Sequence, residues 1–159
     1  LQKVENIIDD RVAELIKDIQ AIPLYGGVSS VVNRLYTTLE KNGYGKNEQL
    51  DYETLSKYDQ TVYHGVDAVL DCINRCNIRS NSQVLNIGSG MGGCARYLSG
   101  KTGCSVLGIE IQNDLHTTAI KLTNRTNLAD KVTHMGGDFL QLGKHLSKSN
   151  YDAVYIMKF

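Results

Sequence analysis

The residues with the clearest chemical meaning form a glycine-rich segment, GSGMGG at residues 88–93, directly after the apolar run 84–87. Glycines between a strand and a helix let the chain turn sharply and let a ligand lie against the backbone, because no Cβ atom stands in the way. The spacing fits glycines at 88, 90 and 92 and equally the dinucleotide spacing 88, 90 and 93. The loop therefore predicts a nucleotide-type ligand without choosing between these two classes.

Two acidic residues follow later apolar runs and could hold the rest of such a ligand. Glu110 ends the run 105–109, where a carboxylate can accept hydrogen bonds from both hydroxyl groups of a ribose. Asp138 and Phe139 follow the run 132–135. There the acid can accept a hydrogen bond from an adenine amino group while the aromatic ring covers the base. A solvated strand-end acid and an ordinary turn are the structural alternatives.

Strands and helices that could position these residues are predicted by an alternation of short apolar runs and longer segments. The apolar runs 84–87, 105–109, 132–135 and 153–157 have the length of strands, and residues 92–99 and 113–127 have the length of helices. Strands that alternate with helices are typical of an α/β fold with a parallel sheet and crossover helices.

The first half of the chain has a different pattern. Apolar residues recur at helical spacing and predict amphipathic helices, with one set at Val4, Ile7, Ile8, Val12, Leu15, Ile16 and Ile19, a second at Val28, Val31, Val32, Leu35 and Leu39, and a third at Val66, Val69, Leu70 and Ile73. We interpret the polar stretch 41–63 as a connection. We expect an N-terminal helical extension over residues 1–80 and a sheet-containing unit over 81–159.

Composition narrows the classes of partner. Lys and Arg total 17 and Asp and Glu total 17, so the formal net charge is zero, and we expect no nucleic-acid partner. The apolar runs are far shorter than a membrane span, so we expect no membrane partner. The four cysteines, Cys72, Cys76, Cys94 and Cys104, lack paired CxxC spacing. This indicates reduced thiols in a cytoplasmic protein rather than disulfides or a metal site.

Four segments, taken together, resemble a known family. Residues 84–93, 108–111, 137–139 and 151–155 are similar, in order and spacing, to the first four strand motifs of class I S-adenosylmethionine-dependent methyltransferases. The resemblance covers residues 82–159. It implies a Rossmann-like sheet with S-adenosyl-L-methionine as cofactor, its methionine part over Gly88, Ser89, Gly90 and Gly92, its ribose at Glu110 beside Ile111, and its adenine at Asp138 and Phe139.

A narrower resemblance involves the segment before the first strand. The glycine loop, residues 58–60 and residues 63–68 are similar to small-molecule amine methyltransferases of the phosphoethanolamine and sarcosine/dimethylglycine type. In those families a comparable segment forms a helical lid over the cofactor, which implies that Tyr63 lies near the methionine end. The alternative is that these residues simply pack a helix onto the sheet.

The sequence also departs from the family pattern. Asn86 stands where the family most often has an aspartate, so the charge is lost while a hydrogen-bonding group remains. The family sheet normally has seven strands, whereas this chain begins at Leu1 and ends at Phe159 inside the fourth predicted strand. We expect it to be a piece of a longer polypeptide that contains the first four strands.

The resulting hypothesis is a methyltransferase that acts on a small-molecule acceptor such as an amine. Six of nine tyrosines precede the sheet, and their ring faces could attract a sulfonium or a methylated ammonium. His64 could accept a proton, but a histidine beside a helix start is commonly a capping or surface residue, so no catalytic residue is assigned. The alternatives are an NAD-dependent oxidoreductase with the same loop and a non-catalytic Rossmann-like fragment that binds a partner. The oligomeric state stays open.

Overall fold

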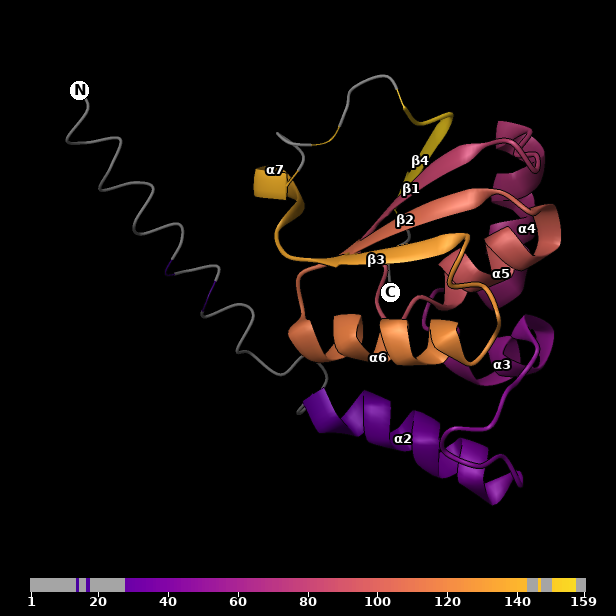
Figure 1. Ribbon diagram of the computed structural model, residues 1–159, viewed down its shortest axis with the longest axis vertical. Coiled ribbons are helices and arrows are strands. Elements are labelled where there is room, and N and C mark those ends of the chain that lie inside the picture. The colour runs from indigo at the N-terminus through magenta and orange to yellow at the C-terminus, as the bar shows by residue number, and fades with distance from the viewer. Residues whose placement is uncertain (1–13, 15–16, 18–27, 143–145, 147–149, 157–159) are drawn as a thin grey trace.

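The computed structural model describes residues 14, 17, 28–142, 146 and 150–156. Its four strands are β1 (Gln83–Ile87), β2 (Ser105–Glu110), β3 (Val132–Gly136) and β4 (Ala153–Ile156). They form one parallel sheet in the order β3-β2-β1-β4 (Figure 1). Each strand matches its predicted apolar run to within a residue at either end, so the predicted sheet is confirmed.

Helices connect the strands and cover one side of the sheet. They are α2 (Val28–Lys41), α3 (Tyr52–Asp59), α4 (Gly65–Cys76), α5 (Gly93–Thr102), α6 (Asn113–Asn124) and the short α7 (Phe139–Leu142). Helices α5 and α6 are the crossovers after β1 and β2, and both pack on the sheet. Helices α3 and α4 contact α5, while α2 lies along α6 (Figure 1). The Rossmann-like α/β arrangement expected from the sequence is therefore confirmed.

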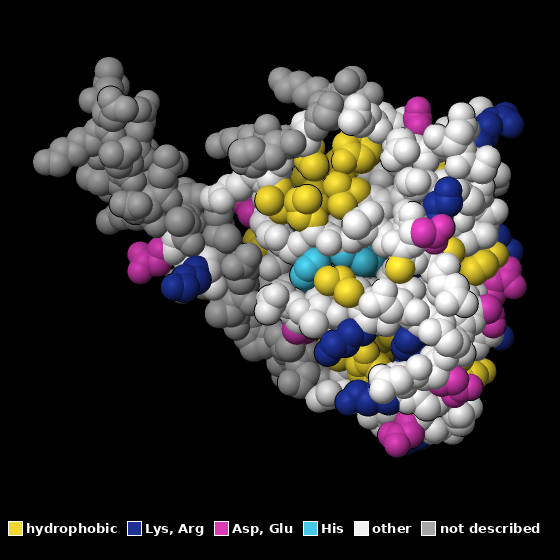
Figure 2. Space-filling view, in the orientation of Figure 1, with side chains coloured by type: hydrophobic (Ala, Val, Ile, Leu, Met, Phe, Trp, Pro, Cys, Tyr) yellow, Lys and Arg dark blue, Asp and Glu magenta, His cyan; other side chains and the backbone are white. Residues whose placement is uncertain are grey.

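The helix-covered face of the sheet contains one of two buried clusters. Val84, Val106 and Val132 are register partners on neighbouring strands, and they pack with residues of α4 and α5. Side chains alternate between the two faces of a sheet, so the residues between them point to the other face. On that face Val154 and Ile156 are exposed, and Figure 2 shows hydrophobic side chains gathered over the strands.

A second cluster joins the N-terminal helices to the glycine loop. It consists of Leu35, Leu39, Leu50, Leu55, Met91, Leu115 and Leu122. The cluster therefore packs α2 and α3 against α6. Because it includes Met91, it also packs them against the loop that follows β1.

Helix α3 is the element that the sequence analysis missed, because residues 41–63 were interpreted as a connection. Asp51 caps it: its Oδ1 accepts the backbone N–H of Thr54 at 2.8 Å, which satisfies a donor that the first turn leaves free. The buried face of α3 contains few aliphatic side chains. Leu55 is buried beside Asp59, and Tyr52 packs edge-on against Tyr97 at 5.9 Å. An aliphatic pattern was therefore too sparse to predict this helix.

The other N-terminal predictions have mixed outcomes. The second and third apolar patterns correspond to α2 and α4. Helix α4 ends where Asn77 adopts a left-handed conformation with φ of 51°. The first pattern, at residues 4–19, lies outside the described residues apart from residues 14 and 17. In the part of the chain that the structure describes, no helix has both the length and the apolar character needed to cross a membrane.

Candidate cofactor and acceptor site

The loop after β1 forms an open cradle at two of its glycines. Gly88 and Gly90 have φ angles of +69° and +55°, which side chains with a Cβ atom rarely adopt. A Cβ atom at Gly88 would meet no atom within 4 Å, and one at Gly90 would meet only Thr61 Oγ1 at 3.7 Å. The carboxyl end of β1 thus has free space directly against the backbone, as a bound ligand requires.

The next two glycines have protein atoms where a side chain would be. A Cβ atom at Gly92 would lie 2.7 Å from the His134 ring and 2.8 Å from Arg96 Nη1. One at Gly93 would lie 2.6 Å from the carbonyl oxygen of Asp59. These glycines let α5 begin close to β3 and to the end of α3. Gly92 was predicted to contact the cofactor, and the structure gives it a packing role at its Cα atom.

Ser89, another predicted cofactor contact, has its side chain beneath the loop. The residue is buried, and its Cβ and Oγ lie 2.9 Å from the position that a Cβ of Gly108 on β2 would take. Its Oγ has no hydrogen-bond partner among the residues that the structure describes, while its backbone N–H donates to the carbonyl of Ile109 at 3.0 Å. Its backbone carbonyl accepts the N–H of Gly92 at 2.9 Å, so both backbone groups of Ser89 are engaged within the protein.

Glu110 joins the end of β2 to the glycine loop. Its side chain is buried, Oε2 accepts the backbone N–H of Gly90 at 2.7 Å, and Oε1 accepts that of Gln112 at 2.8 Å. A carboxylate oxygen has more than one lone pair, so both oxygens can still accept a hydrogen bond from a ribose hydroxyl. Ile111, the next residue, is half-buried. Glu110 is therefore placed where it could bind a ribose, and its hydrogen bond to the N–H of Gly90 also fixes the conformation of the glycine loop.

The third predicted contact region lies next to Glu110. The N–H of Gly137 donates to the backbone carbonyl of Glu110 at 2.9 Å. Asp138 Oδ1 accepts the N–H of Leu140 at 2.9 Å, so this carboxylate caps the short helix α7. Phe139 is the first residue of α7 and is half-buried. The structure thus brings Glu110, Asp138 and Phe139 to the same edge of the sheet, as predicted.

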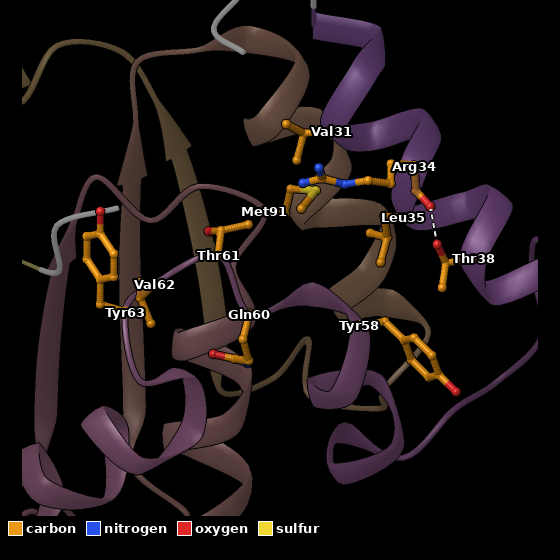
Figure 3. A pocket seen from close by; sticks show the side chains of 10 residues that line it. All are labelled: Val31, Arg34, Leu35, Thr38, Tyr58, Gln60, Thr61, Val62, Tyr63 and Met91. Atoms are coloured by element: carbon orange, nitrogen blue, oxygen red, sulfur yellow. Dashed lines mark hydrogen bonds between the residues drawn. The ribbon is translucent and has the colours of Figure 1, made fainter.

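A cavity of about 460 Å³ lies beside the loop, between α2, the segment 58–63 and Met91. Its lining comes from Val31, Arg34, Leu35 and Thr38 on α2, from Tyr58, Gln60, Thr61, Val62 and Tyr63, and from Met91 of the loop (Figure 3). A smaller hollow lies against Gly88 and Ser89. Both spaces are lined by Thr61 and Val62, so a ligand on the loop and a ligand in the cavity would meet at these residues. Tyr63 contributes to the cavity and is 71% exposed.

A buried ion pair that the sequence analysis did not identify holds this arrangement together. Arg96 Nη2 lies 2.7 Å from Asp59 Oδ2, and both side chains are at most 2% exposed. The same nitrogen donates to the carbonyl of Met91 at 2.7 Å, and Nη1 donates to Thr123 Oγ1 at 3.1 Å. Burial raises the pKa of Asp59, and the Arg96 guanidinium opposes that shift. The pair therefore connects α3, the glycine loop and α6.

One sequence signal could have pointed to this pair. Arg96 is the only charged residue between Arg79 and Lys101, in a segment that was predicted to be a buried crossover helix. A charge in such a place needs a partner. Its partner, Asp59, lies 37 positions earlier in the chain, where no local pattern connects the two.

The family comparison identifies the protein class. The family described as "Histone methylation protein DOT1" matches residues 46–152, which is more than half of the chain. The chain belongs to this family. It is accordingly a member of the class I S-adenosylmethionine-dependent methyltransferases, as its motifs predicted, and S-adenosylmethionine is the cofactor of that class.

Curated relatives of this family member are methyltransferases of small molecules. A phosphoethanolamine N-methyltransferase of Plasmodium falciparum is 29% identical over 119 residues, which cover 75% of this chain and 43% of the relative. A sterol 24-C-methyltransferase of Clavispora lusitaniae is 26% identical over 132 residues, which cover 77% of this chain and 35% of the relative. The chain thus spans less than half the length of these relatives.

Solved methyltransferase structures share the fold. A phosphoethanolamine N-methyltransferase 2 of Haemonchus contortus in complex with S-adenosyl-L-methionine aligns with a TM-score of 0.57 at 20% identity, over 77% of this chain and 28% of that one. An RNA methyltransferase of Salinibacter ruber in complex with S-adenosyl-L-homocysteine aligns with a TM-score of 0.51 at 23% identity, over 57% of this chain and 56% of that one. At these identities the likeness concerns the fold.

Proposed function

We propose that the protein transfers a methyl group from S-adenosylmethionine to a small-molecule acceptor, with an amine as the favoured class. The observation that carries the proposal is the open cradle at Gly88 and Gly90, held by the buried carboxylate of Glu110. The cavity beside it could take the acceptor, because both spaces border Thr61 and Val62.

In this proposal the chain acts mainly by positioning. The cofactor supplies a methyl group on a sulfonium. Glu110 and Ile111 hold its ribose, Asp138 and Phe139 its adenine, and the backbone of Gly88 and Gly90 its methionine part. Holding an acceptor in line and close can contribute several kcal/mol to the rate enhancement. An amine must be unprotonated to react, and a cavity that excludes water favours its neutral form.

The cavity lining supports an amine acceptor more than a purely apolar one. Tyr58 and Tyr63 contribute aromatic rings to it, and ring faces attract cations such as methylated ammonium groups. The curated relatives include a phosphoethanolamine methyltransferase and a sterol methyltransferase, which supports a small-molecule acceptor. We assign no catalytic residue.

The organisation and location of the protein belong to the same proposal. Residues 1–80 would form an extension whose segment 58–63 acts as a lid, and residues 81–159 would hold the cofactor. A cytoplasmic location is supported by the four free cysteines, Cys72, Cys76, Cys94 and Cys104, since an oxidising compartment favours disulfides.

Calorimetric titration with S-adenosylhomocysteine and with NAD tests the cofactor part. We expect binding of S-adenosylhomocysteine only; a protein that binds NAD alone would exclude the proposal. We expect Glu110→Ala to weaken S-adenosylhomocysteine binding by roughly 1.5–3 kcal/mol, the range for hydrogen bonds to a charged group. Because this carboxylate also holds Gly90, we expect a loss of folding stability in the same variant.

Methyl transfer itself is tested with labelled cofactor and a panel of small amines, alcohols and sterols. We expect label to appear in an amine. Transfer only to a sterol or an alcohol would correct the acceptor class. If the protein binds S-adenosylhomocysteine but transfers no label to any acceptor, the proposed activity is contradicted, and only cofactor binding remains.

A further inference from the structure

We propose that Arg34 anchors an anionic group, a carboxylate or a phosphate, on a molecule that occupies the cavity between α2 and the glycine loop. This inference rests on the proposed function in one respect, the assumption that the cavity receives a reactant of the methyl transfer. Beyond the proposed function, the inference specifies that one end of this reactant carries a negative charge.

Arg34 is an exposed residue that lines the cavity. Arg34 lies on α2 one position before the buried Leu35, and its side chain extends from the helix toward Met91 (Figure 3). Among the described residues, none forms an ion pair or hydrogen bond with the guanidinium. The backbone carbonyl of Arg34 accepts the hydroxyl of Thr38 at 2.7 Å. By contrast, Arg96 and Arg75 each pair with an aspartate.

Among the described residues that line the cavity, none carries a charge that offsets Arg34. The ten lining residues include no Asp, Glu, Lys or His, so this guanidinium is their only charge. A purely cationic molecule would be repelled by it, and an anionic group on the same molecule would be attracted. A nearby positive charge also lowers the pKa of an amine, which favours the neutral form that methyl transfer needs.

The type of residue and its surroundings fit an oxyanion. A guanidinium presents several N–H donors in a planar fork that matches the oxygens of a carboxylate or a phosphate. Thr61 brings a hydroxyl group to the same cavity, and it can add a further hydrogen bond to an oxyanion.

Two molecules could supply this group. One is the acceptor, if it carries an acidic group at the end away from its methylated atom. The other is the cofactor, whose methionine part ends in a carboxylate. Arg34 extends toward Met91 (Figure 3), and Met91 directly follows Gly90 in the cradle. The chemistry is the same in both cases, and titrations can separate the two sources.

The experiment compares Arg34→Gln with two other variants of the same helix. Arg34→Lys keeps the charge but loses the fork, and Lys41→Gln removes one positive charge at an exposed position that does not line the cavity. Each variant is titrated separately with inorganic phosphate and with S-adenosylhomocysteine by calorimetry, and its fold is checked by circular dichroism. We expect Arg34→Gln to bind one of the two probes about 10- to 100-fold more weakly, as expected for a charge-assisted hydrogen bond. Arg34→Lys should lose less, and Lys41→Gln should match the unsubstituted protein.

The outcomes distinguish the sources. Weaker phosphate binding alone supports the anchor with the acceptor as its source, and weaker S-adenosylhomocysteine binding alone supports it with the cofactor carboxylate as its source. Unchanged binding of both probes by Arg34→Gln would overturn the inference. If the unsubstituted protein binds phosphate through Arg34 but never binds S-adenosylhomocysteine, the anchor stands and the methyltransferase proposal fails.

Discussion

Gly88 and Gly92 lie in the same loop and both have positive φ angles, but their surroundings differ. Space beside Gly88 is open, whereas the space beside Gly92 is occupied by His134 and Arg96. The same residue type therefore borders open space at one position and allows close packing at the other. Substitutions at the two positions should separate these roles.

We expect Gly88→Ala to abolish most S-adenosylhomocysteine binding while it lowers folding stability by only about 1–2 kcal/mol, the penalty for a Cβ atom in a left-handed conformation. Gly92→Ala meets the same penalty together with contacts of 2.7 and 2.8 Å, so its stability should fall by roughly 1–3 kcal/mol more. Urea unfolding and calorimetric titration measure the two quantities. Equal stability losses, with unchanged binding in Gly88→Ala, would contradict the assignment of an open cradle.

His134 carries a second prediction at this scale, one about pH. Burial of its imidazole, together with the positive charges of Arg96 and His116, lowers the pKa of His134 to about 3 from an ordinary value of 6.5. Its ring nitrogen Nε2 lies 2.8 Å from Thr123 Oγ1. Below pH 6.5 the unfolded chain therefore binds a proton that the folded chain does not, and stability falls as the pH falls toward 3.

The contribution of His134 should reach about 1.4 kcal/mol per pH unit at most. We expect His134→Gln, which does not titrate, to lose less stability than the unsubstituted protein when the pH is lowered from 7 to 5. Urea unfolding at both pH values gives the comparison. The same pH dependence in both proteins would show that His134 is not the group responsible.

Helix α3 is held by a buried charge pair, whereas α4 carries an exposed one. Asp59 and Arg96 are almost fully buried, while Asp71 and Arg75 of α4 form an exposed pair at 2.6 Å. Removing one partner of a buried pair leaves the other charge without compensation. An exposed pair contributes little, because water screens it. Substitutions in the buried pair therefore test what positions α3, and a substitution in the exposed pair is the control.

We expect Arg96→Met to lower the free energy of unfolding by about 3–5 kcal/mol. The double variant Asp59→Leu/Arg96→Met should lose less than the sum of its single variants, because neither charge is left alone. Arg75→Met should change stability by less than about 1 kcal/mol. Chemical denaturation of the unsubstituted protein, the two single variants of the buried pair, the double variant and Arg75→Met measures these differences. Additive losses for the buried pair would argue against direct coupling of α3 to α5.

Strand β4 determines a property of the whole molecule. Ala153 and Tyr155 are buried against the helix-covered face, but Val154 is 54% exposed and Ile156 is 70% exposed. In the described part of the chain, β4 pairs only with β1. Exposed apolar side chains on a strand are a surface on which further chain, of the same or another polypeptide, can pack.

We expect residues 1–159, when produced alone, to associate as their concentration rises and Val154→Lys to reduce this association, because a charge on an exposed strand position opposes edge pairing. Light scattering over a concentration series measures the effect. Ile120→Lys, on the exposed side of α6, is the control for an added charge elsewhere. Association that responds equally to both changes would contradict a role for β4.

Local sequence patterns were sufficient for the sheet and for the class of protein. The four strands follow apolar runs, because strand length, burial and turns are set by neighbouring residues, and the class follows from the resemblance of four motifs to a known family; the contacts of Glu110 and Asp138 with a cofactor stay predictions. Helix α3 was missed, since tyrosines replace the aliphatic residues that a periodic pattern needs.

Tertiary structure decided the rest. Only the folded chain shows that Gly88 faces open space while Gly92 is packed, and that Arg34 and Thr61 line one cavity. The pairing of Asp59 with Arg96 likewise joins distant segments. The physical reason is that cavities and buried charge pairs arise where segments remote in sequence come together. Spacing along a single segment carries no information about such contacts.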